Sequence, residues 1–222
     1  MIRLAQVSKD YVGASTFRAL KDVNLHIAAG EAVAITGPSG SGKTTLLHLM
    51  GLIHKPTTGR VEIGGRDTSQ MPDDERSGVR GRSIGFVFQA FHLVPHLTVL
   101  ENASLPLLYL GMASHERVAR AAACLERVGL GHRLHRLPRE LSGGESQRAA
   151  IARALAADPP VILADEPTGN LDAANSGRIM DDLLALRDTG KTLVVITHDQ
   201  GIAARFPRRI TIFDGNVGGG GA

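Results

Sequence analysis

The sequence predicts an α/β fold whose core is interrupted by a helical insert. Short runs that are apolar throughout, such as 32–35 and 161–164, are typical of strands buried on both faces. Segments with helical periodicity separate these runs, as they do in α/β folds. Strand patterns are missing from about residue 91 to residue 159, where Ala, Leu, Glu and Arg are frequent. We therefore expect one domain over residues 1–217, with a helical subdomain at about 91–159.

The N-terminal part of the chain is expected to be mostly β. Apolar and polar residues nearly alternate over 3–8 and 19–27, which predicts half-buried strands. A helix is expected at 44–50, where Gly51 would end it. A Pro-Thr-Thr-Gly turn then leads into a short strand at 60–63.

The rest of the chain passes through the helical insert and returns to alternating strands and helices. Within the insert, Ser114 is expected to cap a helix, and Glu116 would favour its first turn. The Gly-rich tail at 218–222 has no side chains that could pack, so we expect it to be flexible. The expected helices cover 114–128, 145–157 and 174–188, and the expected strands cover 84–88, 161–164, 192–197 and 209–213.

Length and composition exclude several classes of protein. A chain of 222 residues with 43% apolar and 21% charged residues suits one globular domain and excludes wholesale disorder. The single cysteine, Cys124, cannot form an intrachain disulfide and is expected to pack in a helix. No stretch reaches the roughly 20 apolar residues that span a bilayer, and no signal peptide is visible. We therefore expect a cytosolic protein that serves any membrane process through a partner.

The positive charge of the chain is small and scattered. The formal net charge is +3, from 20 Arg and 5 Lys against 22 acidic residues, and aromatic residues make up 4% of the chain. Proteins that bind nucleic acid usually concentrate basic residues and interleave aromatic ones. We therefore expect a solvated, Arg-rich surface and no nucleic-acid partner.

A glycine-rich loop lies between the strand expected at 32–35 and the helix expected at 44–50. Its residues match the P-loop pattern G-x-x-x-x-G-K-S/T. The glycines allow successive backbone N–H groups to point at a phosphate, and the helix N-terminus adds partial positive charge. Lys43 would contact the β- and γ-phosphates, and the Thr44 hydroxyl would bind Mg²⁺. The expected cradle comprises Gly37, Ser39, Gly40, Ser41, Gly42, Lys43, Thr44 and Thr45.

Two carboxylates follow a second buried strand. Asp165 and Glu166 come directly after 161–164, so we expect them at the carboxyl edge of the sheet, beside the P-loop. Asp165 would hold Mg²⁺ through water, and Glu166 would orient and polarise the attacking water. Taken alone, an Asp-Glu pair after a strand is weak evidence for a metal or catalytic site. The P-loop about 120 residues upstream makes that interpretation informative.

A second phosphate-binding pattern occurs where the helix at 145–157 is expected to begin. Ser142, Gly143 and Gly144 would combine backbone N–H groups, a hydroxyl and a helix dipole. Because the P-loop already supplies one γ-phosphate site, this second cradle would serve the nucleotide of another copy of the chain. Taken alone, the same pattern is more often a plain helix cap.

Six motifs occur in order: the P-loop, Gln89 after the strand at 84–88, Leu-Ser-Gly-Gly-Glu-Ser-Gln-Arg (141–148), Leu-Ala-Asp-Glu-Pro (163–167), Gly-Asn-Leu-Asp (169–172) and Thr-His-Asp (197–199). With them the sequence resembles the nucleotide-binding subunit of an ABC transporter over roughly residues 2–215. The resemblance implies a P-loop NTPase core with a helical subdomain insert and an N-terminal antiparallel β subdomain. It also implies ATP and Mg²⁺ as ligands, and ATPase activity that drives a separate membrane permease.

The resemblance also implies roles for single residues. Tyr11 would stack on adenine, although a surface tyrosine beside a turn is the alternative. Gln89 would contact Mg²⁺ and the attacking water, and His198 would contact the γ-phosphate. Asp172 would belong to a loop that communicates across a dimer. The loop of Ser142, Gly143, Gly144 and Glu145 would clamp the γ-phosphate bound to the opposite subunit.

Glu145 departs from the commonest form of the family signature, which has Gln at this position. This residue and the segments 88–95, 100–107 and 164–172 resemble the branch of bacterial lipoprotein-releasing and macrolide-exporting ATPases. The same branch includes a cell-division ATPase. The resemblance therefore implies export or mechanotransmission at the inner membrane and leaves the substrate open.

The expected mechanism is ATP-dependent closure of a head-to-tail homodimer. Each of two ATP molecules would lie between the P-loop of one chain and the Ser142 loop of the other, and hydrolysis would reopen the pair. The helical insert, including 91–95, would grip a cytoplasmic helix of the permease and so hold the chain at the cytoplasmic face of the membrane. The alternatives are a soluble ABC ATPase acting on DNA or ribosomes, and a cassette that regulates a membrane partner without transport.

Overall fold

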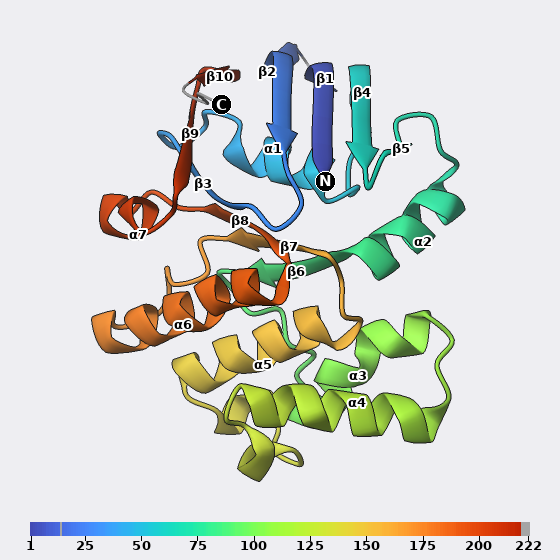
Figure 1. Cartoon of the computed structure of the whole chain (residues 1–222), viewed down its shortest axis with the longest axis vertical. Coiled ribbons are helices and arrows are strands. Elements are labelled where there is room, and N and C mark those ends of the chain that lie inside the picture. The colour runs from blue at the N-terminus through green and yellow to red at the C-terminus, as the bar shows by residue number, and fades with distance from the viewer. Residues whose placement is uncertain (14, 219–222) are drawn as a thin grey trace.

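Two β-sheets and several helices stack in layers in the computed structural model, which describes residues 1–13 and 15–218 (Figure 1). The first sheet has four antiparallel strands in the order β2-β1-β4-β5, and the second has six strands in the order β10-β9-β3-β8-β7-β6. Helices cover the far side of the second sheet. The predicted α/β class, with its antiparallel β subdomain and its helical insert, is confirmed.

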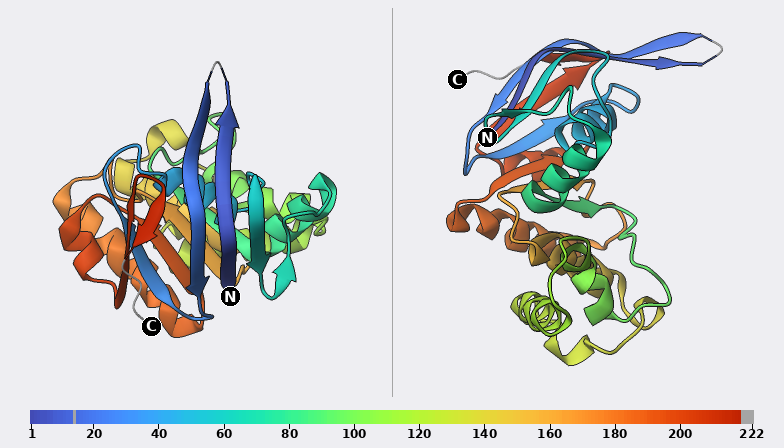
Figure 2. Two further views of the ribbon diagram at one scale, coloured as in Figure 1. Left: turned by 90° about the horizontal axis from the view of Figure 1, so that it is seen from above. Right: turned by 90° about the vertical axis from the view of Figure 1, so that its right-hand side faces the viewer.

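The antiparallel sheet is longer at one end than the sequence predicts. It consists of β1 (Ile2–Val12), β2 (Thr16–Ile27), β4 (Thr58–Ile63) and β5 (Arg66–Asp67). The β1–β2 hairpin extends beyond the body of the molecule, which Figure 2 shows. Val12 and Phe17 are exposed in this extension, so it carries no alternation of buried and exposed positions by which the sequence could reveal it.

The second sheet forms the core of the fold. Its strands are β3 (Ala32–Thr36), β6 (Ile84–Phe88), β7 (Val161–Asp165), β8 (Thr192–Ile196), β9 (Arg208–Phe213) and β10 (Asn216–Gly218). The first five run parallel, and β10 pairs antiparallel with β9 at one edge. Every residue of β3 and β8 is buried, as the continuous apolar runs predict.

The helices form three groups around these sheets. Helix α1 (Lys43–Met50) packs between the two sheets, and α2 (Asp73–Ser83) leads into β6. Helices α5 (Gly143–Ala156), α6 (Ala173–Ala185) and α7 (Gln200–Ala204) pack on the other face of the second sheet. Helices α3 (Val99–Tyr109) and α4 (Ser114–Arg127) share a separate apolar cluster with α5, so α5 joins the helical insert to the core. Short 3₁₀ turns cover Gly131–Arg133, Pro138–Glu140 and Leu186–Thr189.

Several local expectations need correction. Ala113, not Ser114, is the N-cap of α4, and no side chain caps this helix, because Ser114 already lies in its first turn. The helix expected at 174–188 ends as an α-helix at Ala185 and continues as a 3₁₀ turn. Gly218 is not part of a flexible tail, because it pairs with Thr211 in the β9–β10 hairpin. Residues 219–222, the rest of the predicted tail, lie outside the described residues.

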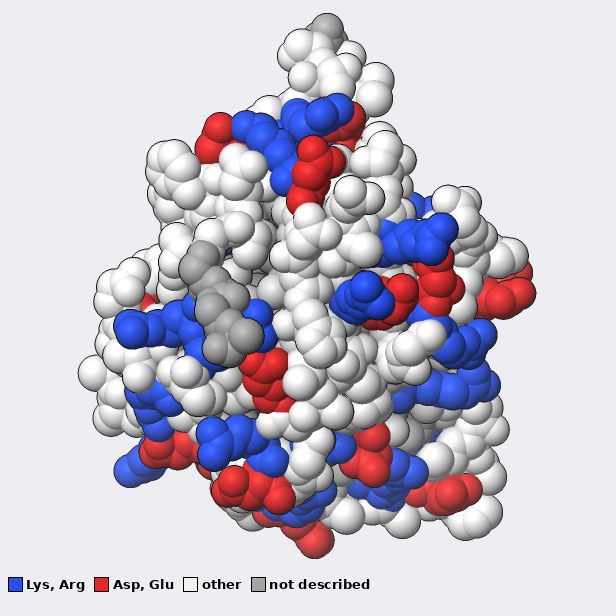
Figure 3. All heavy atoms as spheres, turned by 45° about the horizontal axis from the view of Figure 1, so that its top comes forward, with Lys and Arg blue, Asp and Glu red and all other residues white. Residues whose placement is uncertain are grey.

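Two further observations concern the interior and the surface. Cys124 is buried in the cluster shared by α3, α4 and α5, which confirms its predicted packing role. Figure 3 shows basic side chains interspersed with acidic ones on the face around the antiparallel sheet, and ion pairs such as Arg18–Asp10 (2.8 Å) link them. No helix in the described part of the chain combines the length and the apolar character that a membrane span requires.

Candidate nucleotide site

Four adjacent parallel strands end at one edge of the second sheet, and a predicted site residue follows each of them. The strands lie in the order β3-β8-β7-β6. Ile196 pairs with both Ile35 and Asp165, and Asp165 pairs with Phe88, so the four ends are level. Ligands of such sheets bind beyond the carboxyl ends of the strands. The edge carries Gly37 after β3, His198 after β8, Glu166 after β7 and Gln89 after β6.

The P-loop connects β3 to α1 through backbone conformations that favour glycine. The φ angles are 153° at Gly37, 76° at Gly40 and 106° at Gly42. A Cβ atom on Gly42 would lie 2.6 Å from the backbone oxygen of Ala19, so the loop also requires glycine sterically. Gly42 is the N-cap of α1 and has no side chain to occupy the first N–H groups of the helix. These N–H groups are therefore free of a side-chain cap and can take an anion.

Lys43 and Ser41 lie within this loop. The Lys43 ammonium donates hydrogen bonds to the carbonyl oxygens of Gly37 and Pro38, each at 2.8 Å. The Ser41 hydroxyl oxygen is buried and has no hydrogen-bond partner among the described residues. A buried polar group without a partner is costly, and a ligand oxygen in the loop would satisfy it. The loop therefore fits a phosphate group.

Asp165 at the end of β7 lies close to Thr44 at the start of α1. Burial raises the pKa of the Asp165 carboxyl above its usual range, Glu166 adds to the rise, and His48, Lys43 and a hydrogen bond with Thr44 oppose it. A hydroxyl and a carboxylate are hard oxygen donors of the kind that Mg²⁺ takes beside substrate phosphates. The two side chains fit such an ion.

Glu166 and His198 form a direct pair at the sheet edge. The Oε1 atom of Glu166 lies 2.8 Å from Nδ1 of His198 and accepts the backbone N–H of His198 at 3.0 Å. Glu166 also has a φ of 47°, in the left-handed region, while its N–H donates to the carbonyl of Ile196. A non-glycine residue in this region is uncommon and stores strain that the surrounding bonds must hold.

Gln89 contacts the segment around Asn170, a contact that the sequence does not predict. Its side-chain amide donates to Oδ1 of Asn170 at 3.2 Å, and the Asn170 amide donates back to the carbonyl of Gln89 at 2.9 Å. A Cβ atom on Gly169 would lie 2.6 Å from the Gln89 amide nitrogen. The loop after β6 is therefore tied to the loop before α6. Asn170 lies in the motif at 169–172, but its contact with Gln89 was not predicted, since 81 residues separate the two.

Tyr11 lies on the projecting hairpin, next to the start of α1. Its hydroxyl oxygen is 3.5 Å from the hydroxyl oxygen of Thr45. The ring of His54 meets the Tyr11 ring edge-on at 5.9 Å, and the Lys9 ammonium lies 5.2 Å from the centre of the Tyr11 ring. The tyrosine is 36% exposed, so part of its ring is open to a ligand. His54 and Lys9 were not anticipated from the sequence.

The Ser142 loop begins helix α5. Ser142 is the N-cap, and its hydroxyl accepts the N–H of Glu145 at 3.3 Å, while the Glu145 carboxylate accepts the N–H of Ser142 at 2.8 Å. The plain-cap interpretation is thus correct as a local description and does not exclude a phosphate at the remaining N–H groups. A Cβ on Gly144 would lie 2.7 Å from the side-chain oxygen of Asn175, so this position also takes glycine.

Asp172 caps the helix beside this loop. Its carboxylate accepts hydrogen bonds from the backbone N–H and the side-chain amide of Asn175, at 2.9 and 2.7 Å. These bonds hold the pKa of Asp172 below its usual range, the backbone bond more than the side-chain bond. The Ser142 loop and the Asp172 loop therefore meet at Asn175.

The protein-family model described as "ABC transporter" matches residues 20–169. That is more than half of the chain. The chain belongs to the ABC transporter family. As a member of this family it is an ATPase subunit, and its fold is that of the ATP-binding cassette.

Individual members of the ABC transporter family cover nearly the whole chain. The solved dimeric cassette MJ0796 of Methanocaldococcus jannaschii is 48% identical, with a TM-score of 0.90 over 98% of this chain and 96% of that one. A second solved state of MJ0796 is described as post-hydrolysis and bound to ADP and Pi. The lipoprotein-releasing system ATP-binding protein LolD of Geobacter metallireducens is 45% identical over 98% of this chain and 97% of its own length.

A fused relative comes from the export branch of the ABC transporter family. The macrolide export ATP-binding/permease protein MacB of Chlorobaculum tepidum is 48% identical over 98% of this chain, which spans only 33% of that longer protein. The predicted resemblance to the lipoprotein-release and macrolide-export branch is confirmed by these relatives.

Proposed function

We propose that the chain binds ATP and Mg²⁺ at the edge formed by β3, β8, β7 and β6, and hydrolyses ATP to ADP and phosphate. The observation that carries this proposal is the convergence of the P-loop, His198, Glu166 and Gln89 at the level ends of four adjacent strands. Lys43 and the α1 N-terminus would hold the phosphates, and Tyr11 would stack on the adenine.

Thr44 and Asp165 would hold Mg²⁺, directly and through water, with Gln89 as a further contact. The ion, when bound, neutralises charge on the β- and γ-phosphate oxygens. Thr44 orients its hydroxyl from the first turn of α1, and Asp165 presents its carboxylate from the end of β7. Both donors stand on rigid elements, so they define the position of the phosphates relative to the sheet.

Glu166 would act on the attacking water. A carboxylate at the sheet edge can orient a water toward the γ-phosphate and accept a proton from that water as it attacks. His198 holds Oε1 of Glu166 through two contacts, which leaves Oε2 to face the water. Nδ1 of His198 is engaged by the Glu166 carboxylate, which leaves Nε2 as the ring nitrogen that would contact the γ-phosphate.

A complete catalytic site would need two copies of the chain. In the head-to-tail dimer, the γ-phosphate held by one P-loop would meet Ser142 and Gly144 of the other copy. ATP makes contacts with the closed dimer that ADP cannot make, so ATP favours closure and hydrolysis favours opening. Asn175 contacts both the Ser142 loop and Asp172, so these loops would move together when the dimer closes.

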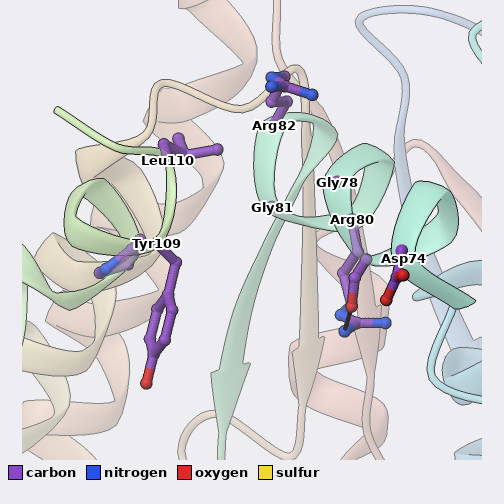
Figure 4. A pocket seen from close by; sticks show the side chains of 9 residues that line it. Asp74, Gly78, Arg80, Gly81, Arg82, Tyr109 and Leu110 are labelled. Carbon is purple, nitrogen blue, oxygen red and sulfur yellow. Dashed lines mark hydrogen bonds between the residues drawn. The ribbon is translucent and has the colours of Figure 1, made fainter.

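The permease would dock on the side of the molecule where α2 and α3 face each other. A groove of about 590 Å³ lies there, with Tyr109 and Leu110 on the α3 side and Arg80 and Asp74 on the α2 side (Figure 4). A second cavity of about 390 Å³ shares Arg80 and Pro106 with the groove and is lined by apolar side chains and Arg153. An apolar cytoplasmic segment of the permease that carries a carboxylate would fit both features.

The segment after Gln89 connects this surface with the catalytic edge. Phe91 and His92 both have positive φ angles of 57° and 50°. The guanidinium of Arg153 donates to the carbonyl oxygens of both residues. A displacement of this segment by the permease would therefore be transmitted to Gln89. The chain would sit at the cytoplasmic face of the membrane through this contact, as one catalytic domain over residues 1–217.

The proposal is tested by assay of phosphate release and by co-purification. The purified chain is expected to release phosphate from ATP only with Mg²⁺, and to co-purify with a membrane protein of its host. Arg82 is exposed at the groove, so Arg82→Glu should reduce co-purification while leaving ATP binding intact. Equal recovery of the membrane protein with both forms would contradict this docking surface. Absence of Mg²⁺-dependent phosphate release would contradict the proposed function itself.

A further inference from the structure

An ion pair supports the Ser142 loop from outside the helix. Arg133 ends the 3₁₀ turn Gly131–Arg133, and its Nε donates to Oε1 of Glu145 at 2.8 Å. The other oxygen of Glu145, Oε2, accepts the backbone N–H of Ser142. The Glu145 side chain is 14% exposed and that of Arg133 is 33% exposed, so solvent only partly screens the pair. Arg133 is thus linked to Ser142 through one carboxylate.

The charge of this carboxylate opposes the proposed task of the loop. The pKa of Glu145 lies below its usual range. The hydrogen bond from the Ser142 N–H lowers it most, and the contact with Arg133 lowers it further. Glu145 is therefore ionised at neutral pH and sits in the first turn of α5. A helix N-terminus attracts anions because of its partial positive charge, and a full negative charge in the first turn cancels this attraction. A γ-phosphate approaching the loop would be repelled unless the carboxylate is neutralised.

We infer that Arg133 is a positioning residue for the loop that receives the γ-phosphate of the second copy. It neutralises the Glu145 carboxylate and fixes it on the Ser142 N–H, so that the remaining N–H groups of the loop face the phosphate with net positive potential. This inference rests on the proposed ATP-sandwich dimer. It concerns the trans half of the site only, so nucleotide binding to the P-loop of the same chain is independent of Arg133.

A neighbouring pair provides a matched control. Arg136 donates to Oε1 of Glu140 at 2.9 Å, and Oε2 of Glu140 accepts the N–H of Leu137 at 2.7 Å. The chemistry is the same as in the Arg133 pair, but this carboxylate caps the 3₁₀ turn Pro138–Glu140 and not α5. Loss of Arg136 should therefore leave dimer formation unchanged.

The experiment measures the ATP concentration that produces half-maximal dimer in a Glu166→Gln background, by gel filtration with Mg²⁺. Adding Arg133→Gln should raise this concentration about tenfold, because the unpaired Glu145 carboxylate in the first turn of α5 would then repel the γ-phosphate of the other copy. Adding Glu145→Gln as well should restore it to within about twofold. Arg136→Gln should have no effect. The affinity of the monomer for ATP and its melting temperature should match those of the background protein.

A charge effect can be separated from a packing effect by salt. The loss caused by Arg133→Gln should shrink at high ionic strength, because salt screens the unpaired carboxylate. A loss that salt does not change and that Glu145→Gln does not rescue would overturn the inference, as would normal dimer formation by Arg133→Gln. If the Glu166→Gln protein itself stayed monomeric with ATP, the sandwich dimer would fail, and this inference would fail with it.

Discussion

Glu166 and His198 are joined by two contacts through a single oxygen: Oε1 of Glu166 lies 2.8 Å from the ring Nδ1 and 3.0 Å from the backbone nitrogen of His198. The side chain of the proposed base is thereby fixed in orientation before any nucleotide arrives. Its positive φ of 47° adds a strained backbone at the same residue. Hydrogen bonds to Ile196 in β8 and to His198 just after it hold this strained residue in place, as a preorganised catalytic edge requires.

Replacement of Lys43 tests the phosphate cradle. The Lys43→Ala chain should bind ATP at least about 100-fold more weakly, because charge-assisted hydrogen bonds contribute roughly 1.5–3 kcal/mol each. Isothermal titration with ATP measures the effect. Lys55→Ala, which removes an exposed lysine paired with Asp73, is the control and should bind ATP normally. Affinity within twofold of wild type for Lys43→Ala would contradict the assigned cradle.

Replacement of Ser142 by a bulky cation tests completion of the site in trans. Ser142→Arg should prevent the two copies from closing and so abolish hydrolysis, while the monomer keeps its ATP affinity because Ser142 would not contact its own nucleotide. Phosphate release and ATP titration on the same protein distinguish the two effects. Hydrolysis at the wild-type rate would show that the Ser142 loop does not complete the site.

The ring of Tyr11 is expected to carry the contact with the base. Tyr11→Ala should weaken ATP binding about tenfold, since stacking of an aromatic side chain on a base contributes about 1–3 kcal/mol. Tyr11→Phe should keep most of the affinity, because the hydroxyl contact with Thr45 is long, at 3.5 Å. Inhibition by tripolyphosphate, which has no base, serves as the internal control and should be equal in all three proteins. An equal loss of tripolyphosphate affinity in Tyr11→Ala would point to a disturbed P-loop instead.

The pKa of Asp165 predicts how stability without ligand changes with pH. Burial raises this pKa in the folded protein, so the folded state binds the proton more tightly than the unfolded state. Asp165 therefore makes folding less favourable as the pH rises through the ordinary carboxyl range and up to the raised pKa. Asp165→Asn should melt at a higher temperature than wild type at pH 7, and the difference should shrink toward pH 4. A lower melting temperature for Asp165→Asn at pH 7 would contradict this account.

The strands of the core were predictable because burial on both faces leaves a simple pattern. The strand at 84–88 was predicted with its observed bounds. The strand predicted at 161–164 extends one residue further, to Asp165. Helix α2 was missed because its sequence has no apolar side chain apart from Val79 and contains two glycines, Gly78 and Gly81, which disfavour a helix. Its first turn is acidic and its last turn is basic, a charge pattern that favours a helix and that could have revealed it.

The motif residues were predictable because each follows a strand or begins a helix, and the sheet brings those points together. Their supporting contacts were not predictable from one sequence. Gln89 and Asn170 are 81 residues apart, and no local pattern connects them. His54 beside Tyr11 and Arg133 beside Glu145 likewise depend on how separate elements pack. Such pairs arise from tertiary structure and leave no periodic or propensity signal.

The most direct test of the central claim is the behaviour of Glu166→Gln. Glutamine can still accept the backbone N–H of His198 but cannot take a proton from water, so hydrolysis should fall by about 100-fold or more. Because the γ-phosphate would then persist, gel filtration with ATP and Mg²⁺ should show a stable dimer, and the same protein with ADP should be monomeric. A monomer at saturating ATP, or phosphate release at the wild-type rate, would contradict an ATP-driven dimer that uses Glu166 to activate water.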